Sequence, residues 1–210
     1  MENPPVNQPK RRLFQWAAVF VVCLAVWVVW LQKQPAPRAV PLPDVSRLEA
    51  GDWVFRSGIS ADSRVIKSIS RSRYSHIGMI VQTVPQVVVA HAATDDDPKH
   101  PDQVLLTPLA EFAAADKADG IAVARPKFLT APQRRQAAQS AAAQRGRAFV
   151  LAARDRQPYY CTLLLLEAVR PHAPQFAPQW QYLDVAVFRG EYLFPEAFAH
   201  ENVEWIYRSE

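Results

Sequence analysis

The hydrophobic pattern of the chain begins with one long apolar run. Residues 13–31 read LFQWAAVFVVCLAVWVVWL and carry no charge, and Trp16, Trp27 and Trp30 lie toward the two ends of this run. Nineteen helical residues span about 28 Å, close to the roughly 30 Å thickness of the hydrocarbon layer, and indole rings favour the membrane interface. The run therefore predicts a transmembrane anchor.

Two other interpretations of this run stay open. A cleaved signal peptide would have a shorter apolar region and a small-x-small cleavage site, whereas Pro35 and Pro37 follow the run here. A lipoprotein signal at Cys23 would need small residues before the cysteine, but residues 20–22 are bulky. Both features favour an uncleaved anchor.

Positive charges flank the predicted anchor unevenly. The short N-terminus, residues 1–12, contains the basic run Lys10–Arg12, and only Lys33 and Arg38 follow the anchor closely. Because positive residues are retained in the cytoplasm, we expect a single-pass protein of the inner (cytoplasmic) membrane with its N-terminus inside. The remainder of the chain would be periplasmic, or extracytoplasmic more generally.

The remainder of the chain divides into a spacer and a domain. Residues 32–44 contain four prolines, which favour an extended, stiff spacer. Residues 45–210 are long enough for one globular domain with a single core, and they contain no internal repeat.

Within residues 45–210, short β runs are grouped between helical segments. The segments expected to be strands are 51–56, 76–84, 87–92, 121–124 and 203–207. The expected helices cover 60–70 (capped by Ser60 or Asp62), the alanine-rich segment after the Thr130 cap, and a segment that begins near Tyr160. Strands with helices before and after them predict an α+β fold.

Composition and charge exclude several classes of protein. Half of the residues are hydrophobic, which excludes a disordered chain, and two cysteines exclude a disulfide-rich scaffold or a four-cysteine zinc site. The net charge is +4, of which residues 1–12 contribute +2 and the rest 21 − 19 = +2. Without a clustered basic stripe, we expect no nucleic-acid partner.

Cys161 is the single thiol of the predicted domain. If a helix begins there, its unpaired N–H groups and dipole would favour a thiolate with a lowered pKa, and hence a nucleophile beside a base. A free cysteine followed by four leucines is also typical of a small buried core residue. Position alone does not decide between these roles.

Two histidines lie on the predicted strands at 76–84 and 87–92. A two-residue hairpin loop would place His91 opposite residue 78 or 80, on the face that carries His76; a three-residue loop would place the histidines on opposite faces. On the first register one imidazole could face a thiol while the other orients it. A structural or a solvated histidine is the alternative for each.

Other polar groups carry weaker signals. Zinc bound by Cys161, His76 and His91 is conceivable, but no HxxxH or CxxC spacing supports it, so we expect no metal and no other cofactor. Asp95–Asp97 resembles part of a calcium loop without its alternating ligands, which favours an acidic surface turn. His100, His172 and His200 are expected at the surface, whereas Asp155 and Asp184 are possible site carboxylates that no sequence pattern supports.

Three blocks together resemble a known family. They are Leu48–Arg56 (LEAGDWVFR), Tyr74–Val81 (YSHIGMIV) and Tyr159–Thr162 (YYCT), with further similarity at Thr107–Leu109 and Gly190–Pro195. Their order resembles the YiiX/YaeF-like permuted papain-fold amidases, relatives of the NlpC-type cell-wall endopeptidases, in which the histidine precedes the cysteine. The resemblance implies a circularly permuted papain-like α+β domain with a small antiparallel sheet and packed helices.

The resemblance also implies roles for individual residues. Cys161 matches the nucleophile and His76 the general base, while His91 stands where many members have Glu and would orient His76. Tyr160 and Thr162 would support the oxyanion or the substrate, together with backbone N–H groups. Thr162 replaces the usual Ser and Leu163 the usual Glu, which leaves an inactive binding module open.

The expected function is therefore that of a membrane-anchored cysteine amidase or peptidase. By analogy with the family, its substrate would be a peptide amide, including peptidoglycan-derived peptides. A lipid acyl hydrolase or acyltransferase on the same fold is the alternative, because the anchor would hold the domain near a bilayer.

Overall fold

The computed structural model describes residues 38–185 and 188–209, which form a mixed α+β unit from Ala39 onward. The predicted anchor at 13–31 lies outside the described residues. Within the described ranges, none of the helices combines the length and apolar character needed to cross a membrane.

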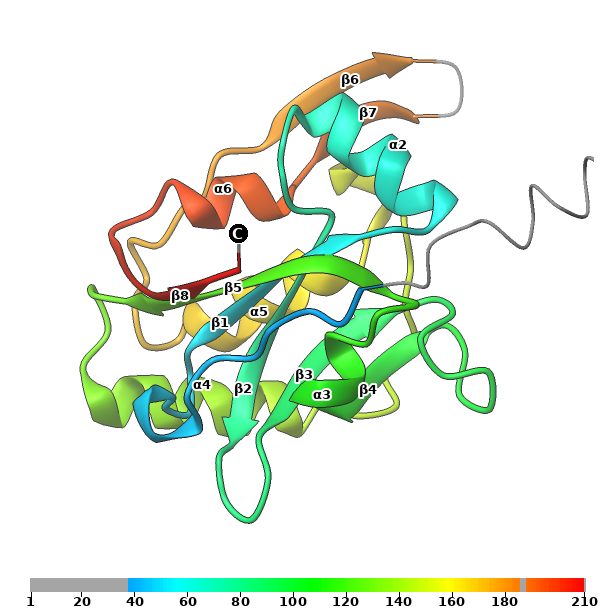
Figure 1. Ribbon diagram of the computed structural model, residues 1–210. Helices are drawn as coiled ribbons and strands as arrows, with labels where there is room; N and C mark the ends of the chain where they lie inside the picture. Colours follow the sequence, from blue (N-terminus) through cyan, green and yellow to red (C-terminus); the bar gives the residue numbers. More distant parts are fainter. Residues whose placement is uncertain (1–37, 186–187, 210) are drawn as a thin grey trace, which may run out of the picture. The chain divides into compact units, whose positions relative to one another are not determined.

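A six-stranded antiparallel sheet is the centre of the unit (Figure 1), with the strand order β4-β3-β2-β1-β5-β8. Its strands are β1 (Trp53–Gly58), β2 (His76–Gln82), β3 (Val88–Ala93), β4 (Gln103–Pro108), β5 (Ala118–Pro126) and β8 (Val203–Arg208). A separate hairpin joins β6 (Gln181–Val185) to β7 (Phe188–Tyr192). The predicted α+β class is confirmed.

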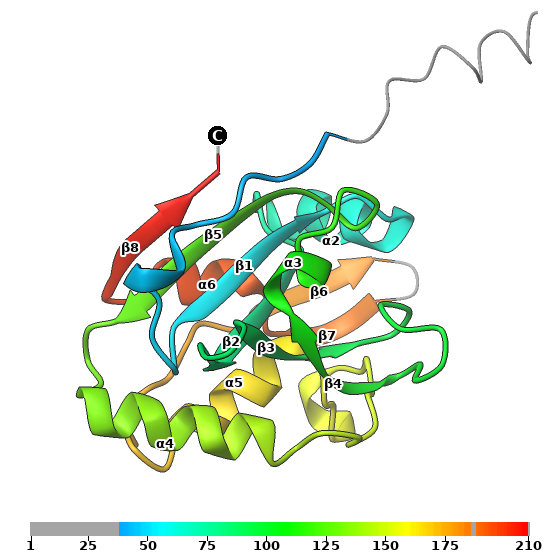
Figure 2. The same ribbon diagram turned by 60° about the horizontal axis from the view of Figure 1, so that its bottom comes forward.

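Helices cover the sheet and its ends. The α-helices are α2 (Ala61–Ser70), α3 (Leu109–Phe112), α4 (Ala131–Ala142), α5 (Cys161–Val169) and α6 (Pro195–Ala199). Of the two 3₁₀ turns, η1 (Val45–Arg47) precedes β1, and η2 (Arg154–Arg156) lies between α4 and α5 in sequence. Figure 2 shows α4 and α5 together on one face of the sheet and α3 on the other.

Local sequence explains where the main helices begin. Ser60 accepts a hydrogen bond from the N–H of Ser63 and caps α2, as predicted. Thr130 and Gln133 form a reciprocal capping box at the start of α4. Helix α5 begins at Cys161, immediately after the expected Tyr160, and its apolar residues are nearly all buried.

The two faces of the sheet bury separate apolar clusters. Trp53 and Phe55 project from β1 toward α4 and α5, whereas Val54 lies among residues of the α3 face, which include Phe112. Val40 belongs to this second cluster, so the folded unit extends a few residues into the segment expected to be a spacer.

Candidate active site

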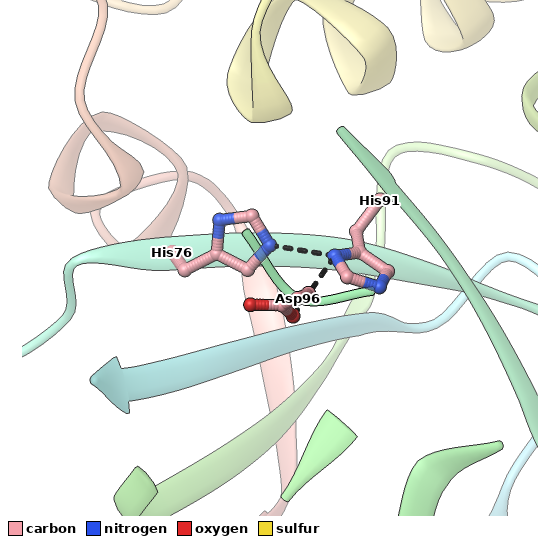
Figure 3. A group of neighbouring side chains, drawn as sticks. All are labelled: His76, His91 and Asp96. Carbon is pink, nitrogen blue, oxygen red and sulfur yellow. Dashed lines mark hydrogen bonds and ion pairs between the residues drawn. The ribbon is translucent and has the colours of Figure 1, made fainter. Parts of the chain in front are cut away.

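Two imidazoles predicted to lie on one face are in contact. Nε2 of His76, the first residue of β2, lies 2.9 Å from Nδ1 of His91 in β3, and a hydrogen bond joins the rings (Figure 3). His91 is fully buried and His76 nearly so. Phe112 packs against both rings and excludes water from this side of the pair.

The strand register explains the contact. Met79 pairs with Ala90 and Ile80 with Val89, which puts His91 opposite position 78, one of the two partners expected from the sequence. The connection is not a two-residue turn: residues 83–87 lie between the strands, and the register shifts by one residue between Gln82 and Ile80, which returns the two histidines to one face. The expected position of His91 opposite residue 78 is therefore found although the loop is longer than two residues.

Gly78 provides the room for this arrangement. A Cβ added there would lie 2.5 Å from Cγ1 of Val89, 2.9 Å from the carbonyl oxygen of Ala90 and 3.2 Å from Cβ of His91. Any side chain would push β3 away from β2. The glycine therefore permits the close approach of the strands at the histidine pair.

Cys161 lies at the N-terminus of α5, beside the beginning of β2. The described pairs of β2 with β3 extend from Gln82 to Met79 and do not continue to Ile77, whose backbone N–H instead interacts with the sulfur of Cys161. The thiol is thus adjacent to the residue that follows His76. Among the described residues no hydrogen bond joins the sulfur of Cys161 to either imidazole.

The expected lowered pKa of Cys161 is wrong. Burial raises the pKa of the thiol to about 11, because an apolar environment disfavours the thiolate. The backbone N–H groups of Ile77, Thr162 and Cys161, together with Arg56, act in the opposite direction but are outweighed. At neutral pH the resting residue is a thiol, so a nucleophilic role needs a base that removes its proton.

Both histidines are suited to remain neutral. Burial lowers the pKa of His91 to about 3, and burial with the nearby Arg56 lowers the pKa of His76 well below its ordinary value. Nδ1 of His76 has no hydrogen-bond partner among the residues that the structure describes, and His76 lines a pocket together with Cys161. This nitrogen is free to accept a proton.

Sequence reasoning missed an ion pair beside the histidines. Arg56 of β1 binds both carboxylate oxygens of Asp96, at 2.6 and 2.9 Å, and both side chains are buried. Asp96 was expected in an acidic surface turn; instead it lies 3.7 Å from Nδ1 of His91. Burial would raise the pKa of Asp96, but the hydrogen bonds and charge of Arg56 lower it, so the carboxylate stays ionised.

The cluster of His76, His91 and Asp96 is a compact set of possible metal ligands, since one atom of each lies within 4.8 Å of the others. Cys161, expected as a ligand in the zinc alternative, is not part of this set. The donor set does not fit a cation. Arg56 already holds both oxygens of Asp96, and the facing histidine nitrogens bind each other.

Tyr160 and Thr162 attach the start of α5 to the segment after β7. The hydroxyl of Tyr160 accepts a hydrogen bond from the N–H of Leu193, and the hydroxyl of Thr162 donates one to the carbonyl of the same residue. Tyr160 lines the pocket, whereas Thr162 is fully buried and does not. Support of the oxyanion by Tyr160 stays a prediction, and the contacts of Thr162 favour a role in holding the helix.

A pocket of about 600 Å³ opens at Cys161 and His76. Polar side chains, including Arg56 and Asp96, line one part of it. The rest is apolar and is formed by α2, the segment before α5, the β6–β7 hairpin and the residues after it: Val65, Ile66, Ile69, Phe149, Leu151, Leu183, Phe188, Tyr192, Leu193, Phe194 and Pro195. The pocket can therefore take an apolar group next to the thiol.

The other histidines do not line this pocket. His100 pairs with Asp97 and His200 with Glu196, both with largely exposed imidazoles, and His172 is half-buried elsewhere. The expected surface position is thus found for His100 and His200, whereas His172 is half-buried.

Of the comparisons with known proteins, only the one with solved structures gave a match. No family model matches the sequence, and no curated protein matches it. The crystal structure of metalloprotein YiiX from Escherichia coli O157:H7 superimposes with a TM-score of 0.63 at 20% sequence identity, covering 78% of this chain and 98% of that chain. The chain has the YiiX fold. The resemblance predicted from the three sequence blocks is thus confirmed at the level of the fold.

Proposed function

We propose that the protein is a cysteine-dependent acyl hydrolase or acyltransferase, with Cys161 as the nucleophile, His76 as the general base and His91 as the residue that orients His76. One observation carries the proposal: Cys161 and His76 line the same pocket while the second nitrogen of His76 binds His91. Nucleophile, base and orienting group are the parts that such a mechanism needs.

The raised pKa of Cys161 sets the order of proton transfer. As the sulfur bonds to the substrate carbonyl carbon, its proton moves to Nδ1 of His76, so no free thiolate is required beforehand. The oxyanion would accept hydrogen bonds from the backbone N–H groups at the start of α5. His76 then returns the proton to the departing amine or alcohol, which leaves a thioester on Cys161.

Water or another acceptor completes the cycle. His76 takes a proton from the attacking molecule as it adds to the thioester carbonyl, and the proton returns to the sulfur as the thioester breaks. The products are the free acid, or the transferred acyl group, and the restored thiol. No step requires a metal, and none is proposed, because Arg56 occupies the carboxylate that would bind one.

The apolar part of the pocket favours a substrate with an apolar acyl group. Ile66 and Ile69 of α2 face this space together with Leu183 and Phe188 of the hairpin. A cell-wall peptide, the substrate class implied by the family resemblance, would depend on the polar part of the pocket and would leave this apolar lining without a matching group. We therefore propose lipid-type amides or esters as the preferred substrate class and peptidoglycan-derived peptides as the second candidate.

The membrane anchor predicted at residues 13–31 would suit this substrate class, because it would keep the domain close to a bilayer. Membrane fractionation of the full chain and of a variant that begins at Arg38 tests the anchor by itself. We expect only the full chain in the membrane fraction.

The decisive experiment is capture of the acyl-enzyme. The full chain is incubated with aryl esters of acetate to decanoate and, separately, with peptidoglycan fragments, and Cys161 is examined by mass spectrometry. We expect an added acyl mass on Cys161 that is favoured by longer chains, and none in the Cys161→Ala protein. If the Cys161→Ala protein gained the same acyl mass at the same rate, Cys161 would not be the nucleophile.

A variant of the pocket tests the substrate class separately. Ile66→Trp adds volume to the apolar lining and leaves Cys161 and His76 themselves unaltered, so it should shift the preference toward shorter acyl chains. Reaction of Cys161 with a small alkylating reagent serves as the control and should stay unchanged. An unaltered chain-length profile would mean that the acyl group lies elsewhere.

A further inference from the structure

A continuous chain of hydrogen bonds leads from the pocket across three strands. His76 of β2 binds His91 of β3 at 2.9 Å, and Nε2 of His91 lies 2.9 Å from Oγ1 of Thr107 in β4. Thr107 pairs with Val89 and is thus the diagonal neighbour of His91 on the same face of the sheet. All three side chains are buried.

Two arrangements of protons satisfy both hydrogen bonds. A neutral imidazole carries one proton, and the lowered pKa values keep both rings neutral. In the first arrangement each ring is protonated on Nε2, so His76 donates to His91 and His91 donates to Thr107. In the second, each ring is protonated on Nδ1, Thr107 donates to His91, and His91 donates to His76.

Only the first arrangement leaves a lone pair on Nδ1 of His76, the nitrogen for which the described residues provide no hydrogen-bond partner. We propose that Thr107 is a positioning residue that selects this arrangement: its hydroxyl accepts a hydrogen bond from Nε2–H of His91, and His76 is thereby held with Nδ1 ready to accept the thiol proton of Cys161. The catalytic part of this inference rests on the proposed function, whereas the proton positions do not.

The groups around His91 favour different positions of its ring proton. Asp96, 3.7 Å from Nδ1 of His91, attracts a proton to that nitrogen and so favours the second arrangement. Arg56 binds both oxygens of Asp96 and reduces this attraction. Phe112, which covers both rings, offers no competing hydrogen-bond partner. Thr107 is the described side chain that faces Nε2 of His91, and as a hydrogen-bond acceptor it stabilises a proton on that nitrogen.

Histidine tautomers can be read directly from the nitrogen shifts of the imidazoles. The full chain is labelled with ¹⁵N-histidine in detergent micelles, and the two rings are assigned with the variants His76→Asn and His91→Asn. We expect both rings of the unaltered protein to carry their proton on Nε2. A proton on Nδ1 of His76 would overturn the proposal without reference to any variant.

Two substitutions of Thr107 form a matched pair. Thr107→Ser keeps the hydroxyl and should keep both tautomers, whereas Thr107→Val keeps the branched shape, removes the acceptor and should populate the Nδ1 proton. Unchanged tautomers in Thr107→Val would contradict the assignment.

The rate at which a small reagent alkylates Cys161 separates this inference from the proposed function. We expect about a tenfold slower reaction in Thr107→Val and near-normal reaction in Thr107→Ser, since the base is then in the wrong form. If the tautomers change as expected while the alkylation rate stays constant in both variants, the positioning role stands and activation of Cys161 by His76 fails.

Discussion

Arg56 and Asp96 form a buried two-point ion pair that adjoins the histidine pair. Their hydrogen bonds are 2.6 and 2.9 Å long, and one nitrogen of Arg56 also donates to the carbonyl oxygen of Phe112. Asp96 comes from the segment after β3 and Arg56 from β1, so the pair ties this segment to the middle of the sheet. It also fixes a cation and an anion close to His91.

Asp96→Asn should be strongly destabilising. It leaves the Arg56 guanidinium buried without its counter-charge, and breaking a buried pair in this way costs about 3–5 kcal/mol. Chemical denaturation measures the loss. The double variant Arg56→Met, Asp96→Asn should be more stable than Asp96→Asn alone, because it no longer buries an unpaired charge. Equal stabilities would mean that the pair is not desolvated as described.

Removal of metal ions should leave the protein unchanged. Arg56 occupies the carboxylate oxygens that a cation would require, so dialysis against a chelator should alter neither the melting temperature nor thioester formation at Cys161. Metal analysis of freshly purified protein is the direct check. Stoichiometric zinc whose loss lowers the melting temperature would contradict the conclusion that the donor set does not fit a cation.

The sequence predicted those parts of the site that have a local pattern. His76 and His91 were found because strand alternation and a hairpin register place them on one face, and Cys161 because a helix start follows Tyr160. Arg56, Asp96 and Thr107 were not recognised as parts of one network, because strand pairing brings them together from distant segments. Three consecutive aspartates are typical of an exposed turn, and nothing local indicates that Arg56 buries the middle one.

Three strands, β4, β6 and β7, were not predicted from the sequence. Residues 103–108 read QVLLTP, a short apolar run that would have supported β4, the strand that carries Thr107. The hairpin strands β6 and β7 are polar and mostly exposed, so they lack the alternation that marks a half-buried strand. Their role in lining the pocket depends on tertiary packing, which no single segment specifies.

Gly78→Ala should disturb the histidine pair through the backbone. The added Cβ would clash with Val89 and the carbonyl of Ala90, and overpacking of this kind costs about 1–3 kcal/mol. We expect a lower denaturation midpoint and slower alkylation of Cys161. Gly120→Ala in β5 is the matched control: the atom nearest to its added Cβ would be Oγ of Ser209, at 3.0 Å rather than 2.5 Å, so it should cost less. An equal loss in both variants would contradict the role of Gly78.

The protein should lose stability as the pH falls below about 6.5. His76 and His91 have lowered pKa values in the folded state and ordinary ones when unfolded, so below the ordinary value the unfolded chain binds more protons. Each group contributes a slope of up to about 1.4 kcal/mol per pH unit. Denaturation at pH 7, 6 and 5 measures this slope.

His91→Gln is the control for this acid sensitivity. It removes one titrating group, and although it lowers stability at every pH by altering the hydrogen bonds, it should reduce the slope between pH 6 and 5. An unchanged slope would mean that His91 is not held neutral by burial. Asp96 acts in a different range: its lowered pKa contributes stability that is lost only as the pH falls below about 4, its ordinary range.

The pH dependence of Cys161 alkylation distinguishes a base-assisted thiol from a free thiolate. With its pKa raised to about 11, unassisted Cys161 should react about tenfold faster for each pH unit up to that value. We expect His76→Asn to follow this steep profile. The unaltered protein should react faster near neutral pH and with a shallower profile, because neutral His76 removes the proton during the attack, and the lowered pKa of His76 keeps it neutral at mildly acidic pH. Coincident profiles in the two proteins would show that His76 does not act on Cys161, whereas a reaction that is fast and independent of pH in both would show that the thiol is ionised at rest despite its burial.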